Sequence, residues 1–178
     1  MRDSPTFGET KRVTDVVLVL VLCALAGCSS SASGPKKEKI DRILIEKSAH
    51  TLTLMDGDTP VKTYMVSIGR VPVGRKERAG DHKTPEGNYI IDSKNPNSKF
   101  HLALHVSYPN AQDRARAGKL GVDPGGNIEI HGLEKGLGWI GPLQREVDWT
   151  DGCVALTDSE IDEVYARVPV GTPVEIRP

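Results

Sequence analysis

Apolar and polar residues alternate with a period of two along much of the chain, which is typical of β-strands with one buried face. The sequence Asp56-Gly57-Asp58 is a turn signal between the second and third of these segments. Strands are expected at residues 43–46, 51–54, 61–68, 88–92, 102–106, 128–131 and 174–176. The pattern predicts a mainly β fold with short helices.

Two segments have the spacing of short helices instead. Residues 110–119 are rich in Ala and Arg, and Gly121 follows as a helix stop. Near the C-terminus, Thr157 and Glu160 form a capping box before apolar residues spaced three and four apart. Those apolar residues are Ile161, Val164, Tyr165 and Val168.

The first 39 residues have a different character from the rest of the chain. Lys11 and Arg12 precede an apolar run at 16–26, which is shorter than the roughly 20 residues that a membrane-spanning helix needs. This pattern indicates a secretion signal. Residues 29–39 are rich in Ser and Lys without apolar periodicity, as in a flexible tether.

The run ends in Leu25-Ala26-Gly27-Cys28, which resembles the lipobox of bacterial lipoproteins. This resemblance implies that residues 1–27 are a lipoprotein signal peptide and that Cys28 carries the lipid. The following Ser29 implies delivery to the outer membrane, on the periplasmic side of the envelope. The expected organisation is therefore a signal at 1–27, a tether at 28–39 and one folded domain at 40–178.

Composition and charge narrow the possible functions. The 23 basic and 24 acidic side chains nearly balance, so nucleic acid is not an expected partner. Apolar residues make up 38% and aromatic residues 4% of the chain, with 18 Gly and 12 Pro. Such a composition predicts a small aliphatic core and many turns.

The cysteine count then singles out one residue. Cys23 would leave with the signal and Cys28 would carry lipid, so Cys153 would be the sole thiol of the mature chain. An unpaired cysteine in an exported protein is buried, paired between chains, or used for its chemistry.

Two short segments supply the partners that a catalytic thiol needs. His131 ends an expected strand on the face opposite Ile128 and Ile130, and Cys153 follows Gly152 shortly before the C-terminal helix. A thiolate nucleophile needs a base and amide N–H groups that hold an oxyanion. His131 and the Gly152 backbone are candidates for these roles.

Two opposing effects are expected to act on the ionisation of the Cys153 thiol. The nearby helix N-terminus would lower the pKa of Cys153, whereas the carboxylates of Asp148 and Asp151 would raise it.

The His-Gly at 131–132 and the Thr-x-Gly-Cys at 150–153 resemble the signature of the L,D-transpeptidase (YkuD-like) catalytic domain. Residues 80–89 are similar to the Thr-Pro-x-Gly segment of that family, and Ser107-Tyr108-Pro109-Asn110 is similar to its YafK-like branch. The resemblance implies a β-sandwich-like mixed-sheet catalytic domain over 40–178.

The same resemblance implies the roles of the residues and the substrate. Cys153 would be the nucleophile and His131 the general base, with Gly152, Thr150 and Gly132 supporting the oxyanion site and no cofactor. The substrates would be peptidoglycan stem peptides, attacked at the diaminopimelate carbonyl to form a thioester. An amine would then resolve the thioester by cross-linking or anchoring.

One position departs from the family pattern. Ala155 stands where Gly-Cys-x-Arg has an arginine, a departure that the YafK-like branch shares. That branch is associated with hydrolysis, so release of a wall-anchored lipoprotein or trimming of tetrapeptides stays an alternative. A lipoprotein that binds peptidoglycan without turnover is a second alternative.

Other chemistry is less well supported by the sequence. The remaining histidines lack the spacing of a zinc site, so no metal is expected. In papain-like hydrolases the Cys precedes the His, the reverse of the order here. Trp139 and Trp149 could stack on substrate or cover the core, and the Gly-rich residues 136–142 could form a lid or a plain loop.

Overall fold

The computed structural model describes residues 38–178. The predicted signal peptide, the lipidation site at Cys28 and most of the tether expected at 28–39 lie outside the described residues.

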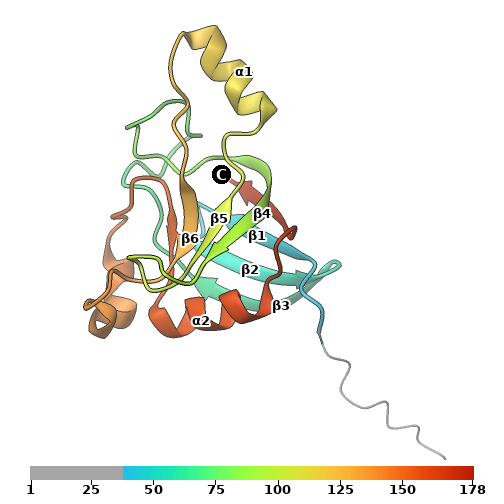
Figure 1. Ribbon diagram of the computed structural model, residues 1–178, viewed down its shortest axis with the longest axis vertical. Coiled ribbons are helices and arrows are strands. Elements are labelled where there is room, and N and C mark those ends of the chain that lie inside the picture. Colours follow the sequence, from blue (N-terminus) through green and yellow to red (C-terminus); the bar gives the residue numbers. More distant parts are fainter. Residues whose placement is uncertain (1–37) are drawn as a thin grey trace, which may run out of the picture. The chain divides into compact units, whose positions relative to one another are not determined.

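Eight strands form one continuous sheet in the order β3-β2-β1-β8-β4-β5-β6-β7 (Figure 1). The strands are β1 Arg42–Glu46, β2 Thr51–Asp56, β3 Thr59–Met65, β4 Gly87–Asn95, β5 Ala103–Val106, β6 Ile128–His131, β7 Val154–Ala155 and β8 Pro173–Arg177. The β1–β8 and β6–β7 pairs are parallel, and the other pairs are antiparallel. The predicted mainly β, mixed-sheet fold with short helices is confirmed.

Strand β4 connects the two halves of this sheet. Its first residues, Gly87 to Ile90, pair with β8, and residues from Ile91 to Asn95 pair with β5. The register shifts between Ile91 and Ser93, and irregularities of this kind bend a strand and increase its twist. The sandwich-like character therefore comes from one sheet that turns at β4.

The third strand is shorter than the expected 61–68, because it ends at Met65. From there the chain leaves β2 and crosses to the far end of the sheet. Ser67 exchanges backbone hydrogen bonds with Ala155 of β7, with N···O distances of 3.1 and 2.8 Å, and Gly69 forms a second bridge to Thr150. This crossing joins the segment after β3 to β7, the strand that directly follows Cys153.

Both predicted helices are present with the expected end signals. Helix α1 (Ala111–Leu120) begins at the Asn110 cap and ends at Gly121, whose φ of 67° is left-handed. Helix α2 (Asp158–Arg167) has the Thr157–Glu160 capping box. The two helices lie at opposite ends of the sheet in Figure 1. Within residues 38–178, no helix is both long and apolar enough to span a membrane.

The Gly-rich segment contains structure that the sequence did not predict. Residues Gly138–Glu146 form 3-10 turns, named η1, which are interrupted at Gly141. The segment leaves Trp139 79% exposed, so this side chain does not cover the core.

The core is aliphatic, as the composition predicts. Burying such side chains provides the main driving force for folding. Strand residues such as Ile43, Leu54 and Ile130 pack with Ile161 and Val164 of α2, and all are fully buried. Helix α2 thus covers an apolar face next to the strands that carry the candidate site.

A buried ion pair holds the long connection between β3 and β4. Lys47 Nζ donates to Glu86 Oε1 and to the Gly74 carbonyl, both at 2.7 Å, and its side chain is only 2% exposed. Removing one partner of a buried pair leaves a charge without a counterion.

We therefore expect Lys47→Ala to lower the free energy of unfolding by about 3–5 kcal/mol in urea titrations. The exposed Lys62–Glu163 pair is the control, and Lys62→Ala should cost about 1 kcal/mol or less. Equal losses in both variants would contradict a special role for the buried pair.

Candidate active site

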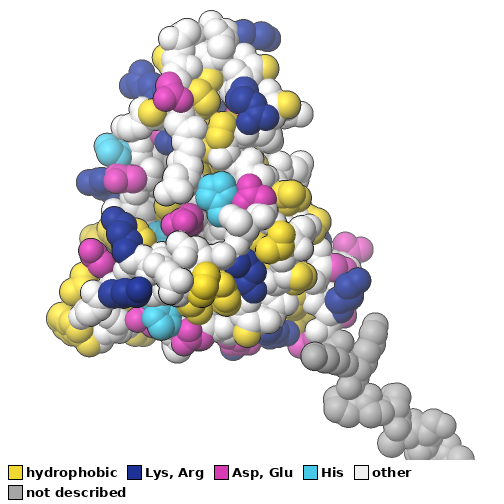
Figure 2. Space-filling view, viewed as in Figure 1, with side chains coloured by type: hydrophobic (Ala, Val, Ile, Leu, Met, Phe, Trp, Pro, Cys, Tyr) yellow, Lys and Arg dark blue, Asp and Glu magenta, His cyan; other side chains and the backbone are white. Residues whose placement is uncertain are grey.

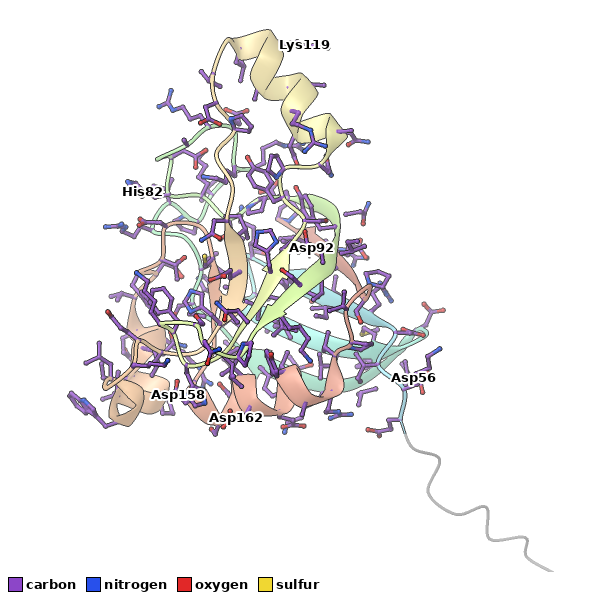
Figure 3. All side chains as sticks on the ribbon, viewed as in Figure 1. Asp56, His82, Asp92, Lys119, Asp158 and Asp162 are labelled. Carbon is purple, nitrogen blue, oxygen red and sulfur yellow. The ribbon has the colours of Figure 1, made fainter. Side chains whose placement is uncertain are left out.

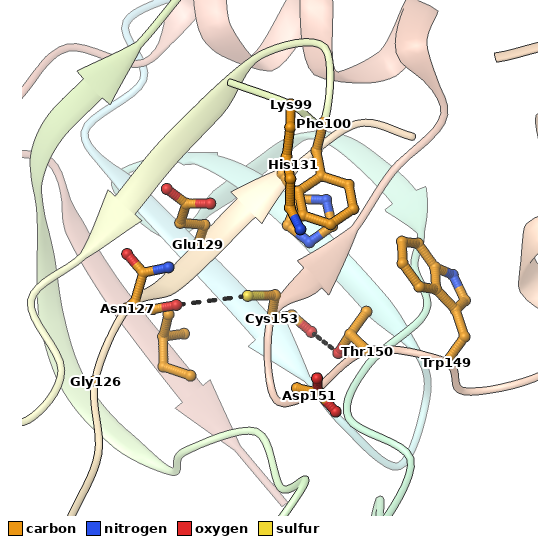
Figure 4. Close-up of a pocket in the computed structure, with 11 residues that line it drawn as sticks. Lys99, Phe100, Gly126, Asn127, Glu129, His131, Trp149, Thr150, Asp151 and Cys153 are labelled. Atoms are coloured by element: carbon orange, nitrogen blue, oxygen red, sulfur yellow. Dashed lines mark hydrogen bonds between the residues drawn. The ribbon is translucent and has the colours of Figure 1, made fainter. Parts of the chain in front are cut away.

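A cavity of about 340 Å³ brings together the segments that the sequence singled out. Its walls come from the loop before β5, from β6 with the residues preceding it, and from the turn before β7 (Figure 4). The lining residues are Lys99, Phe100, Gly126, Asn127, Ile128, Glu129, His131, Trp149, Thr150, Asp151 and Cys153. His131 and Cys153 therefore line one cavity although 22 positions separate them in the sequence.

The turn that carries Cys153 is fixed by the Thr150 side chain. Thr150 Oγ1 donates to the Cys153 carbonyl at 2.7 Å and accepts the Gly152 N–H at 3.1 Å. The Thr150 N–H donates to the Ile68 carbonyl, which anchors the turn to the crossing segment. Thr150 is thus placed as a support for the turn, and its hydroxyl is fully engaged there.

Only glycine fits at position 152 without a change in the backbone. Its φ is +125°, and a Cβ at this position would lie 2.5 Å from the Lys83 carbonyl oxygen. Lys83 belongs to the segment that resembles the Thr-Pro-x-Gly motif, so that segment packs directly behind the cysteine turn. The Gly152 N–H is occupied by Thr150, whereas none of the hydrogen bonds found within residues 38–178 uses the Cys153 N–H.

Gly132 also allows close packing. A Cβ on Gly132 would lie 2.8 Å from both Asp158 Oδ1 and Ile161 Cγ2 of helix α2. The residue after His131 therefore lets β6 approach the helix closely, and its carbonyl remains available to the imidazole.

The imidazole of His131 is held from several sides. Phe100 stacks on it with ring centroids 4.3 Å apart, and Trp149 meets it edge-on at 5.8 Å. His131 Nδ1 lies 2.7 Å from the Gly132 carbonyl oxygen. Because a carbonyl only accepts, Nδ1 carries the proton and Nε2 is left as the acceptor.

The thiol of Cys153 does not bond to this imidazole. Its Sγ lies 3.7 Å from the Asn127 carbonyl oxygen, which is the hydrogen bond drawn in Figure 4. The structure therefore places the predicted nucleophile and base around one cavity, without a hydrogen bond between their side chains.

Both groups are neutral at physiological pH. Burial raises the pKa of Cys153 to about 11, a backbone hydrogen bond from Glu129 opposes the rise, and the charges of Glu129 and Asp151 add to it. Burial lowers the pKa of His131 to about 4, against the effect of the Gly132 hydrogen bond. Of the two carboxylates expected to act on the thiol, Asp151 does so, whereas Asp148 is bound to His50 and to the Ile68 N–H.

The other four histidines each pair with a different carboxylate. The pairs are His50–Asp148, His82–Asp151, His101–Asp162 and His105–Asp92. Figure 3 shows His82, Asp92 and Asp162, which belong to three of these pairs, well apart. In the part of the chain that the structure describes, no three His, Cys, Asp or Glu side chains are arranged to hold a metal ion.

Sequence reasoning did not assign several residues of the cavity. Phe100 and Lys99 lie in a short loop whose sequence carries no motif. Glu129 could be expected to lie near His131, because the period-two pattern of β6 puts both residues on the same face of the strand, and both line the cavity. Trp149 was left open between substrate contact and core, and it lines the cavity while its Nε1 donates to Gln144 Oε1 at 2.8 Å.

Comparisons with known proteins give a consistent result. The family model for the L,D-transpeptidase catalytic domain (YkuD) matches residues 40–176. YafK of Escherichia coli (strain K12), named as an L,D-transpeptidase, is 27% identical over 170 residues. The match covers 86% of this chain and 61% of YafK, so the chain spans less than two thirds of this curated relative.

Solved structures share the fold. The helical cell shape determining protein Pgp2 of Campylobacter jejuni is 25% identical with a TM-score of 0.58, over 80% of this chain and 51% of Pgp2. Bd1075 of Bdellovibrio bacteriovorus is 25% identical with a TM-score of 0.53, over 78% of this chain and 48% of its own. An L,D-transpeptidase of Mycobacterium smegmatis, at 16% identity and a TM-score of 0.51, has the same fold over 76% of this chain and 58% of its own.

The raised pKa of Cys153 predicts slow alkylation at neutral pH. Because the thiolate is the reactive form, the iodoacetamide rate should rise about tenfold per pH unit up to pH 10 and level off near pH 11. Peptide mass spectrometry of the Cys153 adduct measures this rate. Denatured protein is the control, with a midpoint near the ordinary thiol pKa of about 8.5. A midpoint below pH 8 in the folded protein would contradict the electrostatics described above.

Proposed function

The chain belongs to the L,D-transpeptidase catalytic domain family, and we propose that it performs cysteine-dependent acyl transfer on peptidoglycan stem peptides. The observation that carries this proposal is the cavity in which Cys153, on its rigid turn, meets the stacked imidazole of His131. A non-catalytic binding protein would have no need for a thiol and a neutral imidazole in one cavity.

In the proposed mechanism the resting pair is neutral. Substrate binding displaces the thiol from the Asn127 carbonyl, and His131 Nε2 accepts its proton as sulfur attacks. The Nδ1–H bond to the Gly132 carbonyl fixes the tautomer in which Nε2 is the acceptor and supports the imidazolium that forms. A low imidazole pKa makes this ion pair short-lived, so proton transfer and attack are coupled.

The first half-reaction forms a carbon–sulfur bond at the diaminopimelate carbonyl and moves the carbonyl electrons to oxygen. Collapse of this oxyanion breaks the carbon–nitrogen bond, and the imidazolium donates its proton to the leaving D-Ala nitrogen. A thioester remains on Cys153. An amine or water then loses a proton to His131, attacks the thioester, and releases the thiol as the imidazolium returns the proton to sulfur.

We assign oxyanion stabilisation to the Cys153 N–H. The Gly152 N–H, our first candidate from the sequence, donates to Thr150 Oγ1. Preorganised amide donors stabilise the charge that develops in the transition state. Gly152 and Thr150 then act by holding the turn, and Gly132 by positioning the imidazole.

The second half-reaction has two outcomes, and Ala155 bears on the choice between them. Its side chain is fully buried in the sheet, and its backbone is bonded to Ser67, so no charged group extends from position 155. Transfer to an amine would give cross-linked or anchored products. Hydrolysis would trim tetrapeptides or release a wall-anchored lipoprotein, the alternative that the missing arginine supports.

Cys153→Ala should abolish D-Ala release from diaminopimelate tetrapeptides, because no thioester can form, while the free energy of unfolding changes little at this partly buried residue. Mass spectrometry of the muropeptides measures the products. In the same assay, His131→Gln should reduce turnover at least about a hundredfold, because the general base is lost. Cross-linked dimers would indicate transfer, and release of a linked peptide would indicate hydrolysis. Turnover at the parental rate in Cys153→Ala would exclude the mechanism.

We also propose that the chain works on the periplasmic side of the envelope, held to the outer membrane by a lipid on Cys28. The basis is the lipobox-like Leu25-Ala26-Gly27-Cys28. Wall remodelling from this position could contribute to cell shape, the process in the name of Pgp2.

Cys28→Ala should move the protein from the membrane fraction to the soluble fraction, because the lipid would supply the stable attachment. Cell fractionation with immunodetection measures the shift, and Cys23→Ala is the control that should leave the protein in the membrane. Unchanged membrane association of Cys28→Ala would exclude the anchor.

A further inference from the structure

We propose that Glu129 and Lys99 form a subsite beside the thiol for a zwitterionic side chain, in which Glu129 binds an ammonium and Lys99 binds a carboxylate of the same substrate residue. The inference rests on the proposed function and specifies how the cavity would select its substrate. Both residues line the cavity that contains Cys153 and His131.

Neither charge has a partner among residues 38–178. Elsewhere in the domain, buried Lys47 and Lys76 are bonded to carboxylates at 2.7 and 2.8 Å. No ion pair or side-chain hydrogen bond within the described residues uses Glu129 or the Lys99 ammonium, which contacts only the face of the Phe100 ring at 4.7 Å. A cation and an anion are thus left free in the same cavity.

The position of Glu129 is set by the sheet. Ile128 and Ile130 point into the core, so Glu129 shares the opposite face of β6 with His131. Its cross-strand neighbour is His105, but His105 Nδ1 is bonded to Asp92 Oδ1 at 2.6 Å. The carboxylate of Glu129 therefore stays unpaired in a half-buried place.

Leaving a carboxylate partly desolvated without a partner is unfavourable. Burial raises the pKa of Glu129, and the charges of His105 and Lys99 oppose this rise. A ligand ammonium placed against this carboxylate would supply the missing hydrogen bonds. The same charge also raises the pKa of Cys153, so binding a cation there would favour the thiolate.

Lys99 is held at the opposite part of the cavity by aromatic packing. Its ammonium lies over Phe100, and Phe100 stacks on His131. Figure 4 shows Lys99 beside His131 and Glu129 further along the same cavity, toward Asn127. The face of the domain drawn in Figure 2 carries both signs of charge, interspersed.

The arrangement distinguishes three kinds of side chain. One that ends in ammonium and carboxylate, as diaminopimelate does, satisfies both groups. Lysine satisfies Glu129 alone, and a side chain that ends only in a carboxylate satisfies Lys99 alone. A substrate lacking one charge leaves a protein charge unpaired, which is a strong basis for discrimination.

The test combines protein variants with substrate variants. We would measure kcat/KM for D-Ala release from tetrapeptides whose third residue is diaminopimelate, lysine or 2-aminopimelate, which lacks the side-chain ammonium. Both charges also act on the catalytic pair, so the readout is the ratio of kcat/KM values between peptides. Glu129→Gln should lower kcat/KM for diaminopimelate and lysine about tenfold to a hundredfold relative to 2-aminopimelate. Lys99→Met should lower it for diaminopimelate and 2-aminopimelate relative to lysine.

Substitutions of exposed charges outside the cavity serve as matched controls. Lys135→Met and Glu146→Gln remove charges of the same kinds, and neither should change the preference among the three peptides. Iodoacetamide rates of each variant report the effect on thiol reactivity, which is common to all substrates.

An equal effect of Glu129→Gln or Lys99→Met on all three peptides would overturn the proposal, because it would mean that the charge acts only on the catalytic pair. Calorimetric binding of the same peptides to Cys153→Ala tests the subsite without turnover. If Glu129→Gln or Lys99→Met lowers the affinity for particular peptides in the Cys153→Ala background, the subsite is supported. Absence of D-Ala release by the parental protein would count against the proposed reaction and not against the subsite.

Discussion

The candidate site depends on the closure of one curved sheet between the segment after β3 and strand β7. Ser67 and Ala155 exchange backbone hydrogen bonds, and the Thr150 N–H donates to the Ile68 carbonyl on the same crossing. On its other side, β7 runs parallel to β6, and the Leu156 N–H donates to the His131 carbonyl at 2.9 Å. The short strand β7 thus fixes the cysteine turn against both the crossing segment and β6, the strand that ends at His131.

This closure accounts for the fixed turn that carries Cys153 and for the raised pKa of its thiol. The turn is packed against the Lys83 carbonyl behind Gly152, and the thiol is surrounded by protein with Glu129 and Asp151 nearby. Low solvation disfavours the thiolate and the imidazolium alike. In the proposed mechanism, the thiol therefore stays neutral until a substrate changes its surroundings, and the charged groups that line the cavity would influence its reaction.

Much of this organisation could be predicted from local sequence patterns. Period-two alternation located the strands, and the Asn110 and Thr157 caps with Gly121 located the helix ends, because these signals act over a few neighbouring residues. The His-Gly and Thr-x-Gly-Cys segments indicated which residues line the cavity. The end of β3 at Met65 was not predictable, since Val66 to Ile68 keep the strand pattern and are redirected by a long-range pairing with β7. Phe100 and Lys99 were missed for the same reason, because only the tertiary fold brings their loop to His131.

The absent arginine at position 155 follows from this geometry. Ala155 is fully buried and both of its backbone polar groups bond to Ser67, with a further bond from Gln144 Nε2 to its carbonyl. Because Ala155 is fully buried, an arginine side chain at this position would have to displace its neighbours, and a buried charge without a partner is strongly unfavourable. In this chain the positive charge of the cavity comes instead from Lys99, on a loop before β5 and close to the imidazole. Within residues 38–178, the family's His-Gly and Thr-x-Gly-Cys segments thus line one cavity, and the cation of that cavity, Lys99, lies on a different element of the fold from position 155.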